Sequence, residues 1–187
     1  MLTHKGTITL TTKRLVLIKL SIDHIQEMYD NYATDTKMTK YLSWEPYTDI
    51  EKMREFMLKC ISEYENIECY HWVITMNETF IGTINLHNIV NRHERCELGY
   101  CIGSKWWNKG IMTEAVREMI RFAFEELNMN KVSALHDTEN ITSGKVMQKN
   151  GMKQEGLLRE HSVRKDGSRG DLAVYAILKR EWSERNE

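Results

Sequence analysis

Very little in this 187-residue sequence is typical of a membrane-bound or secreted protein. It contains one proline, Pro46, and no Pro/Gly/Ser-rich linker or internal repeat, so we expect a single continuous domain over residues 1–187. No apolar run approaches the roughly 20 residues that span a bilayer, and no signal-peptide pattern stands at the N-terminus. The sequence therefore predicts a cytoplasmic protein that does not enter a membrane.

The sequence also lacks an excess of charge of either sign. It has 26 basic and 27 acidic side chains, so no basic surface is available for phosphate-driven binding, and we expect no direct nucleic-acid partner. The cysteines show no C-x-x-C spacing, which is typical of reduced and mostly buried thiols: Cys60, Cys69, Cys96 and Cys101. We expect neither a disulfide framework nor a metal site.

Apolar periodicity predicts a strand followed by two helices in the first third of the chain. The run R-L-V-L-I-K-L at 14–20 is typical of a strand, and Ser21 follows it as the cap of an amphipathic helix. Thr48 and Glu51 form a T-x-x-E pattern, which predicts the capping box of a second helix.

The rest of the chain alternates between strand and helix patterns. The expected elements are a hairpin of 70–76 and 79–86, a strand at 96–103, an amphipathic helix from Ile111 to Leu127, a strand at 131–136, a helix capped by Asn140 and ending near Asn150, and a hairpin of 157–163 and 172–178. The order β-α-α-β-β-β-α-β-α-β-β indicates an α/β fold with a mixed central sheet flanked by helices.

The segment W-W-N-K-G-I-M-T-E-A at 106–115 leads from a predicted strand into a predicted helix. A helix start offers unpaired backbone N–H groups and a positive dipole, which together suit a phosphate. The segment matches neither the Walker nor the Rossmann pattern. On its own it leaves two readings open: a loop for another phosphorylated ligand, or Gly110 and Thr113 merely shaping a helix start.

A second motif, N-I-T-S-G-K-V-M-Q-K-N-G-M at 140–152, favours the reading in which the 106–115 loop binds a phosphorylated ligand. With the 106–115 segment, E-L-G-Y-C-I-G at 97–103 and E-G-L-L-R-E at 155–160, it resembles the Gcn5-related N-acetyltransferase (GNAT) superfamily. Within that superfamily the chain is similar to the RimJ/RimL-like branch of ribosomal-protein N-terminal acetyltransferases. The resemblance covers nearly the whole chain.

The resemblance implies acetyl-CoA as co-substrate and a sheet that splays where it binds. The residues implied as its contacts are Tyr100, Cys101, Ile102, Asn108, Lys109, Gly110, Ile111, Met112, Thr113, Asn140 and Ser143. The chain departs from the family's pattern in two places. Trp107 and Met112 occupy the outer positions of the usual pyrophosphate loop, and Met147 stands where many members carry a tyrosine that acts as general acid. A backbone-binding loop tolerates Met112 if its side chain points into the core. Trp106 and Trp107 either cover the pantetheine arm or anchor the loop.

Acetyl transfer needs a proton for the leaving thiolate and a base for the amine. The resemblance and its position after Asn140 give Ser143 the first role, and Glu97, which shares a strand face with Cys101, could take the second. An exposed strand glutamate is the alternative reading of Glu97. Second-choice carboxylates are Glu155 and Glu160, and His71 and His136 titrate usefully but more often are structural.

The acceptor implied by the family branch is a protein N-terminus. An α-amino group has a pKa near 7.8 and needs only a modest base, unlike a lysine amine near 10.4. Tyr41, Trp44 and Trp72 could line the acceptor pocket, although the core is the better expectation for Trp72. Small amines, a CoA-binding regulatory module and a non-acyl nucleotide binder stay open as alternatives. The resemblance also implies a homodimer, which no apolar pattern in the sequence demonstrates.

Overall fold

The computed structural model of the protein describes residues 2–186. Its strands and α-helices, in chain order, are β1 (Leu10–Thr11), β2 (Val16–Ile18), α1 (Ile25–Met28), α2 (Thr36–Thr39), α3 (Ile50–Ser62), β3 (Tyr70–Met76), β4 (Thr79–Val90), β5 (Arg95–Ile102), α4 (Ile111–Arg121), β6 (Lys131–Asp137), α5 (Ile141–Lys149), β7 (Lys153–Val163), β8 (Arg169–Leu178) and α6 (Lys179–Asn186). The fold class is mixed α/β, as the sequence predicts.

The described chain forms two compact units. One, called here the loop unit, comprises residues 4–85 and 100–115, and the other, the hairpin unit, comprises 2–3, 86–99 and 116–186. Each is built from segments that are separated in sequence. The expectation of a single domain stays a prediction.

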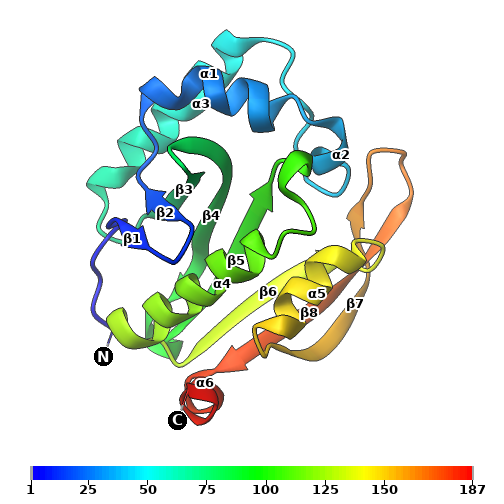
Figure 1. The fold of residues 1–187 in the computed structure, drawn as a ribbon. Helices are drawn as coiled ribbons and strands as arrows, with labels where there is room; N and C mark the ends of the chain where they lie inside the picture. The colour runs from blue at the N-terminus through cyan, green and yellow to red at the C-terminus, as the bar shows by residue number, and fades with distance from the viewer. Residues whose placement is uncertain (1, 187) are drawn as a thin grey trace. The chain divides into compact units, whose positions relative to one another are not determined.

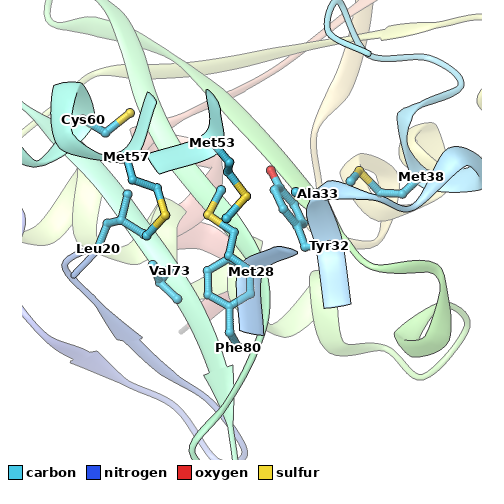
Figure 2. Close-up of a cluster of buried hydrophobic side chains, with 10 residues drawn as sticks. All are labelled: Leu20, Met28, Tyr32, Ala33, Met38, Met53, Met57, Cys60, Val73 and Phe80. Carbon is cyan, nitrogen blue, oxygen red and sulfur yellow. The ribbon is translucent and has the colours of Figure 1, made fainter. Parts of the chain in front are cut away.

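In the loop unit, β1, β2, β3 and β4 are neighbours in that order, and β2 pairs antiparallel with both β1 and β3. Helices α1 and α3 bury their apolar stripes against these strands because their apolar residues recur at helical spacing. Figure 2 shows the resulting core, which contains Met28, Met53 and Met57 together with Leu20 and Phe80. Thioether side chains are unbranched and flexible, so they fill the irregular space between helix and sheet.

In the hairpin unit, β5, β6, β8 and β7 are neighbours in that order. β5 and β6 are parallel, whereas β8 is antiparallel to both β6 and β7. Helix α5 packs on β6 (Figure 1), and this contact is close because a Cβ on Gly144 would lie 2.7 Å from Nε2 of His136. Strand β7 is the last strand of this order, and most of its side chains are exposed.

Some predicted element boundaries are wrong. Helix α3 is capped by Asp49 and not by Thr48, because Asp49 has extended backbone dihedrals and its carboxylate accepts from the Glu51 amide at 2.9 Å. Ser21 is a cap, as predicted, but it opens a short 3-10 turn before α1. The helix expected to reach Leu127 changes to a π-turn at Phe122–Glu126.

Other elements were missed or misplaced. β1 and α2 are too short to show a period, and α6 is polar on nearly every side, so none of the three was expected. β7 begins at Lys153, four residues before the predicted start, because an exposed strand carries little apolar alternation. Within the described residues, no helix is long and apolar enough to cross a membrane.

Candidate active site

The loop that precedes α4 turns sharply through two residues with left-handed backbone angles. Asn108 has φ +60° and Gly110 has φ +70°, and both are exposed. The next two side chains, Ile111 and Met112, are only 2% and 7% exposed. The Met112 side chain therefore lies in the core, which is the condition for a loop that binds phosphate through its backbone. The first-turn amides of α4 lack intrahelical acceptors.

Arg14 holds this loop, although it was not among the residues predicted from the sequence. Its Nη1 donates to the Lys109 carbonyl at 3.0 Å, and its Nε donates to Oε2 of Glu114 at 2.6 Å. Thr12 donates to the same carboxylate at 2.7 Å. Burial alone would raise the pKa of Glu114, but the hydrogen bonds from Thr12 and Arg14 outweigh it and lower the pKa. Thr12 and Arg14 thus hold the start of α4, and Arg14 also holds the loop and places a positive charge beside it.

The carboxyl end of β5 supplies Tyr100, Cys101 and Ile102 to the loop unit. The Cys101 thiol lies 2.7 Å from the Tyr32 hydroxyl, and burial raises the pKa of both groups. Trp107 donates its indole N–H to the Ile102 carbonyl at 2.9 Å. This hydrogen bond supports the reading in which Trp107 anchors the loop.

The turn between β5 and the loop is packed against the backbone of the segment after α1. Asp35 accepts a 2.7 Å hydrogen bond from the Ser104 amide while it also caps α2. Gly103 lies so close to Asn31 that a Cβ would stand 2.3 Å from the Asn31 carbonyl oxygen. These contacts hold the turn at residues 103–104 against the segment that follows α1.

In the hairpin unit, the N-cap of α5 brings Asn140 and Ser143 together. The Asn140 side-chain oxygen accepts from the Ser143 amide at 3.3 Å, and Ser143 is half-buried in the first turn. His136 lies beneath this helix, where its Nδ1 is 2.7 Å from the Asp137 carbonyl. Within the described residues its Nε2 has no hydrogen-bond partner, so the ring is only half satisfied.

Glu97 is paired with His87, which was not among the site residues predicted from the sequence. Its Oε1 lies 3.1 Å from Nε2 of His87, and the Glu97 side chain is 26% exposed. The hydrogen bond from His87 lowers the pKa of Glu97 against the opposing effect of burial. The sequence contains a hint of this pair, because the two residues stand at similar distances on either side of the turn after β4. Only the register of the strands shows that their side chains meet.

The second-choice carboxylates have different surroundings. Glu155 is exposed and pairs with Lys131 at 2.6 Å. Glu160 lies in a bulge of β7 with φ +51°, and its amide donates to Asp171 at 2.8 Å. This bulge borders an open cavity of about 730 Å³, whose lining residues are Leu157, Leu158, Arg159, Glu160, His161 and Asp171.

The remaining aromatic and histidine candidates belong to the loop unit. Trp72 is fully buried, which agrees with its expected core role. Trp44 is half-buried, with its ring centroid 5.7 Å from that of Tyr32, and Tyr41 lies under the Lys40 ammonium group. Burial lowers the pKa of His71, which favours a neutral structural ring. Trp44 therefore fits a pocket wall better than Trp72 does.

Comparisons with known proteins identify the family. The family profile described as acetyltransferase (GNAT) domain matches residues 14–153. An uncharacterised N-acetyltransferase, p20 of Bacillus licheniformis, is 31% identical over 94% of this chain and 98% of its own length. The [ribosomal protein uS5]-alanine N-acetyltransferase of Escherichia coli is 28% identical over 94% of this chain and 93% of its own.

The solved structures agree on the fold. The structure of RimL, a ribosomal L7/L12 alpha-N-protein acetyltransferase in complex with coenzyme A, superposes with a TM-score of 0.83 at 16% identity, over 91% of this chain and 98% of its own. At that identity the likeness concerns the fold alone. The family match spans most of the chain, including the 106–115 loop and the start of α5. The protein belongs to the GNAT acetyltransferase family and is an acetyl-CoA-dependent N-acetyltransferase.

Proposed function

We propose that this N-acetyltransferase acetylates the α-amino group of a protein N-terminus, that of a ribosomal protein among the candidates, in the cytoplasm. The observation that carries the proposal is the similarity over nearly the full chain to the [ribosomal protein uS5]-alanine N-acetyltransferase of Escherichia coli. The lowered pKa of Glu97 agrees with it, because a weak carboxylate base suits an α-amine better than a lysine.

Direct transfer from acetyl-CoA to the amine is favoured over an acetyl-enzyme. Thiolates, not thiols, are the nucleophiles of cysteine chemistry. Burial raises the pKa of Cys60 to about 11 and of Cys96 to about 12, and it also raises the pKa of Cys69 and Cys101. The cysteines are therefore thiols at neutral pH, and both substrates must be bound together.

The residues of the loop unit suit a bound acetyl-CoA. The exposed turn at Asn108–Gly110 with the α4 N-terminus would hold the pyrophosphate, and Arg14 adds a cation beside it. Gly110 leaves room for this approach, since the nearest atom to a Cβ there is a guanidinium nitrogen of Arg14 at 3.8 Å. When bound, acetyl-CoA supplies the thioester that is attacked.

Two residues of the hairpin unit would move the protons. Glu97, ionised and held by His87, would take a proton from the acceptor ammonium through water. The neutral amine would then form the C–N bond as the C–S bond breaks. Ser143 would donate a proton to the leaving sulfur, and the second proton that the nitrogen loses would replace it on Ser143. The products are the N-acetylated terminus and CoA thiol, with one proton released.

The β7 cavity is our candidate for the acceptor site. Its carboxylates, Glu160 and Asp171, suit an ammonium group, while Leu157 and Leu158 are exposed and offer an apolar wall to a small first side chain. A peptide terminus carries both features, because its ammonium group stands next to its first side chain.

Acceptor choice is tested by following CoA thiol release with short peptides that begin with alanine or serine, matched N-formylated peptides, spermidine and glucosamine. We expect turnover of the free peptides only, because N-formylation removes the amine while retaining the rest of the sequence. Turnover of the small amines in preference to the peptides would contradict the proposed acceptor, although the family assignment would stand.

Glu97→Gln is expected to reduce kcat/KM most at low pH. The wild-type base can accept a proton from a bound ammonium group, whereas the variant depends on the neutral fraction of an amine with a pKa near 7.8. Because the pKa of Glu97 is lowered, the carboxylate stays ionised from pH 8 to pH 6. The neutral fraction falls by about 40-fold from pH 8 to pH 6, so the ratio of wild-type to variant activity should grow by up to about 40-fold over this range.

The matched control for this profile is Glu184→Gln, which changes an exposed carboxylate of α6 in the same unit. Its profile should follow the wild type. A constant ratio between wild type and Glu97→Gln across the pH range would remove Glu97 from the role of base.

A further inference from the structure

An ion pair between the buried Asp137 and the partly exposed Arg164 connects the tip of the β7–β8 hairpin to the end of β6. Asp137 is 7% exposed, and the guanidinium of Arg164 binds both of its oxygens, through Nε at 2.8 Å and Nη2 at 2.9 Å. The third nitrogen, Nη1, lies 2.8 Å from Glu139. The hydrogen bond from Arg164 is the main reason that the pKa of Asp137 is lowered. All three guanidinium nitrogens therefore contact the segment that leaves β6.

The same aspartate shapes the turn that leads from β6 into α5. Its Oδ1 accepts from the Glu139 amide at 2.9 Å, and its backbone carbonyl accepts from the Asn140 amide at 2.8 Å. The Thr138 amide donates to the Asp171 carbonyl at 3.0 Å. Three consecutive amides are thus fixed before the helix begins.

This turn ends at the cap that holds Ser143. Asn140 receives the Ser143 amide on both its backbone and its side-chain oxygen, at 3.1 and 3.3 Å. A shift of the 137–140 turn would therefore move the first turn of α5 with it. A chain of contacts thus runs from Arg164 through Asp137 and Asn140 to Ser143, and the contact of Arg164 with Glu139 lies beside it.

The hairpin is built to approach this closely. A Cβ on Gly170 would lie 2.7 Å from Oδ2 of Asp137 and 2.5 Å from Oγ of Ser162, so only glycine lets β8 pass here. Arg164 is itself fixed, because its amide donates to the Ser168 carbonyl at 2.9 Å across the hairpin turn. The guanidinium is therefore presented from a closed turn and not from a free loop.

We infer that Arg164 is a positioning residue for acetyl transfer, which acts through Asp137 to fix the start of α5 and thereby the place of Ser143. The inference rests on the proposed role of Ser143 in the reaction. Arg164 needs no contact with either substrate for this role. A lysine could supply the charge but not the two-pronged geometry, because only a planar guanidinium matches both carboxylate oxygens at once.

The test compares Arg164→Ala and Arg164→Lys with the wild type, using whichever amine the wild-type enzyme acetylates. Misplacement of a reacting group by about 1 Å costs on the order of 100-fold, so kcat of Arg164→Ala should fall by about 10- to 100-fold with the KM for acetyl-CoA little changed. Guanidinium ion at low, non-denaturing concentration should restore part of the lost kcat. The control is Arg180→Ala, which removes an exposed arginine of α6. Its kcat should equal that of the wild type, with or without added guanidinium ion.

A double variant separates positioning from general support of the fold. If Arg164 acts through Ser143, the Ser143→Ala/Arg164→Ala enzyme should be no slower than Ser143→Ala, because effects within one unit are not additive. Additive losses, an unchanged kcat in a folded variant, or a kcat loss that guanidinium does not relieve would overturn the inference. If Arg164→Ala does not fold, Arg164→Lys is judged by the same criteria. An unaffected Ser143→Ala enzyme would instead count against the proposed function.

Discussion

Ser143→Ala is expected to lower kcat by about 100-fold or more while the KM for acetyl-CoA stays nearly constant. The thiolate is the leaving group, and without a hydrogen-bond donor its negative charge develops unassisted in the transition state. The substitution retains the cap of the helix, because the cap uses the Ser143 amide. Alanine also has the highest helix propensity, which favours the same helix.

Steady-state kinetics with acetyl-CoA and acceptor varied separately will measure the effect, with thermal unfolding as the check on folding. Thr142→Ala is the matched control, since it removes an exposed hydroxyl from the same turn of α5. If both variants keep wild-type kcat, Ser143 is an ordinary helix residue. A raised KM for acetyl-CoA at constant kcat would make it a binding residue.

Gly103→Ala is expected to destabilise the protein and weaken acetyl-CoA binding together. The added Cβ would lie 2.3 Å from the Asn31 carbonyl oxygen and 2.8 Å from the Trp106 ring. The dihedrals of Gly103, φ −52° and ψ 142°, are accessible to alanine, so the effect is purely steric. Overpacking costs about 1–3 kcal/mol, and here the closest atom is backbone and cannot rotate away.

The structure would relieve this clash by moving the turn that carries Ser104 and the loop beyond it. For a chain of this size the cost corresponds to a Tm lower by about 2–12 °C. Gly156→Ala is the control, because no atom lies within 4 Å of a Cβ at that position. Equal Tm values for the two alanine variants, or unchanged acetyl-CoA affinity of Gly103→Ala, would contradict the expected result.

The sequence was most informative where one residue acts on its near neighbours. Asn140 as a helix cap, the two hairpins and the turn at Gly110 could all be predicted, because each depends on a few consecutive residues. The Thr48 error is of the same kind, since two adjacent residues both suit an N-cap and only the backbone angles of Asp49 distinguish them.

Contacts between distant segments could not be predicted. Arg14 and Glu114 are 100 residues apart, and nothing in either local pattern points to the other. The same holds for Arg164 and Asp137, whose meeting depends on how β8 pairs with β6 and β7. The Glu160 bulge is a local deviation from strand register, which a pattern with a period of two residues does not contain.

The protonated cysteines have a practical consequence for assays of this enzyme. Chromogenic disulfides, which detect released CoA, react with thiolates and only slowly with neutral thiols. With the pKa of every cysteine raised by burial, the folded protein should contribute little background colour at neutral pH. Unfolding would expose the same thiols, so a rising blank absorbance would report loss of the native fold during the measurement.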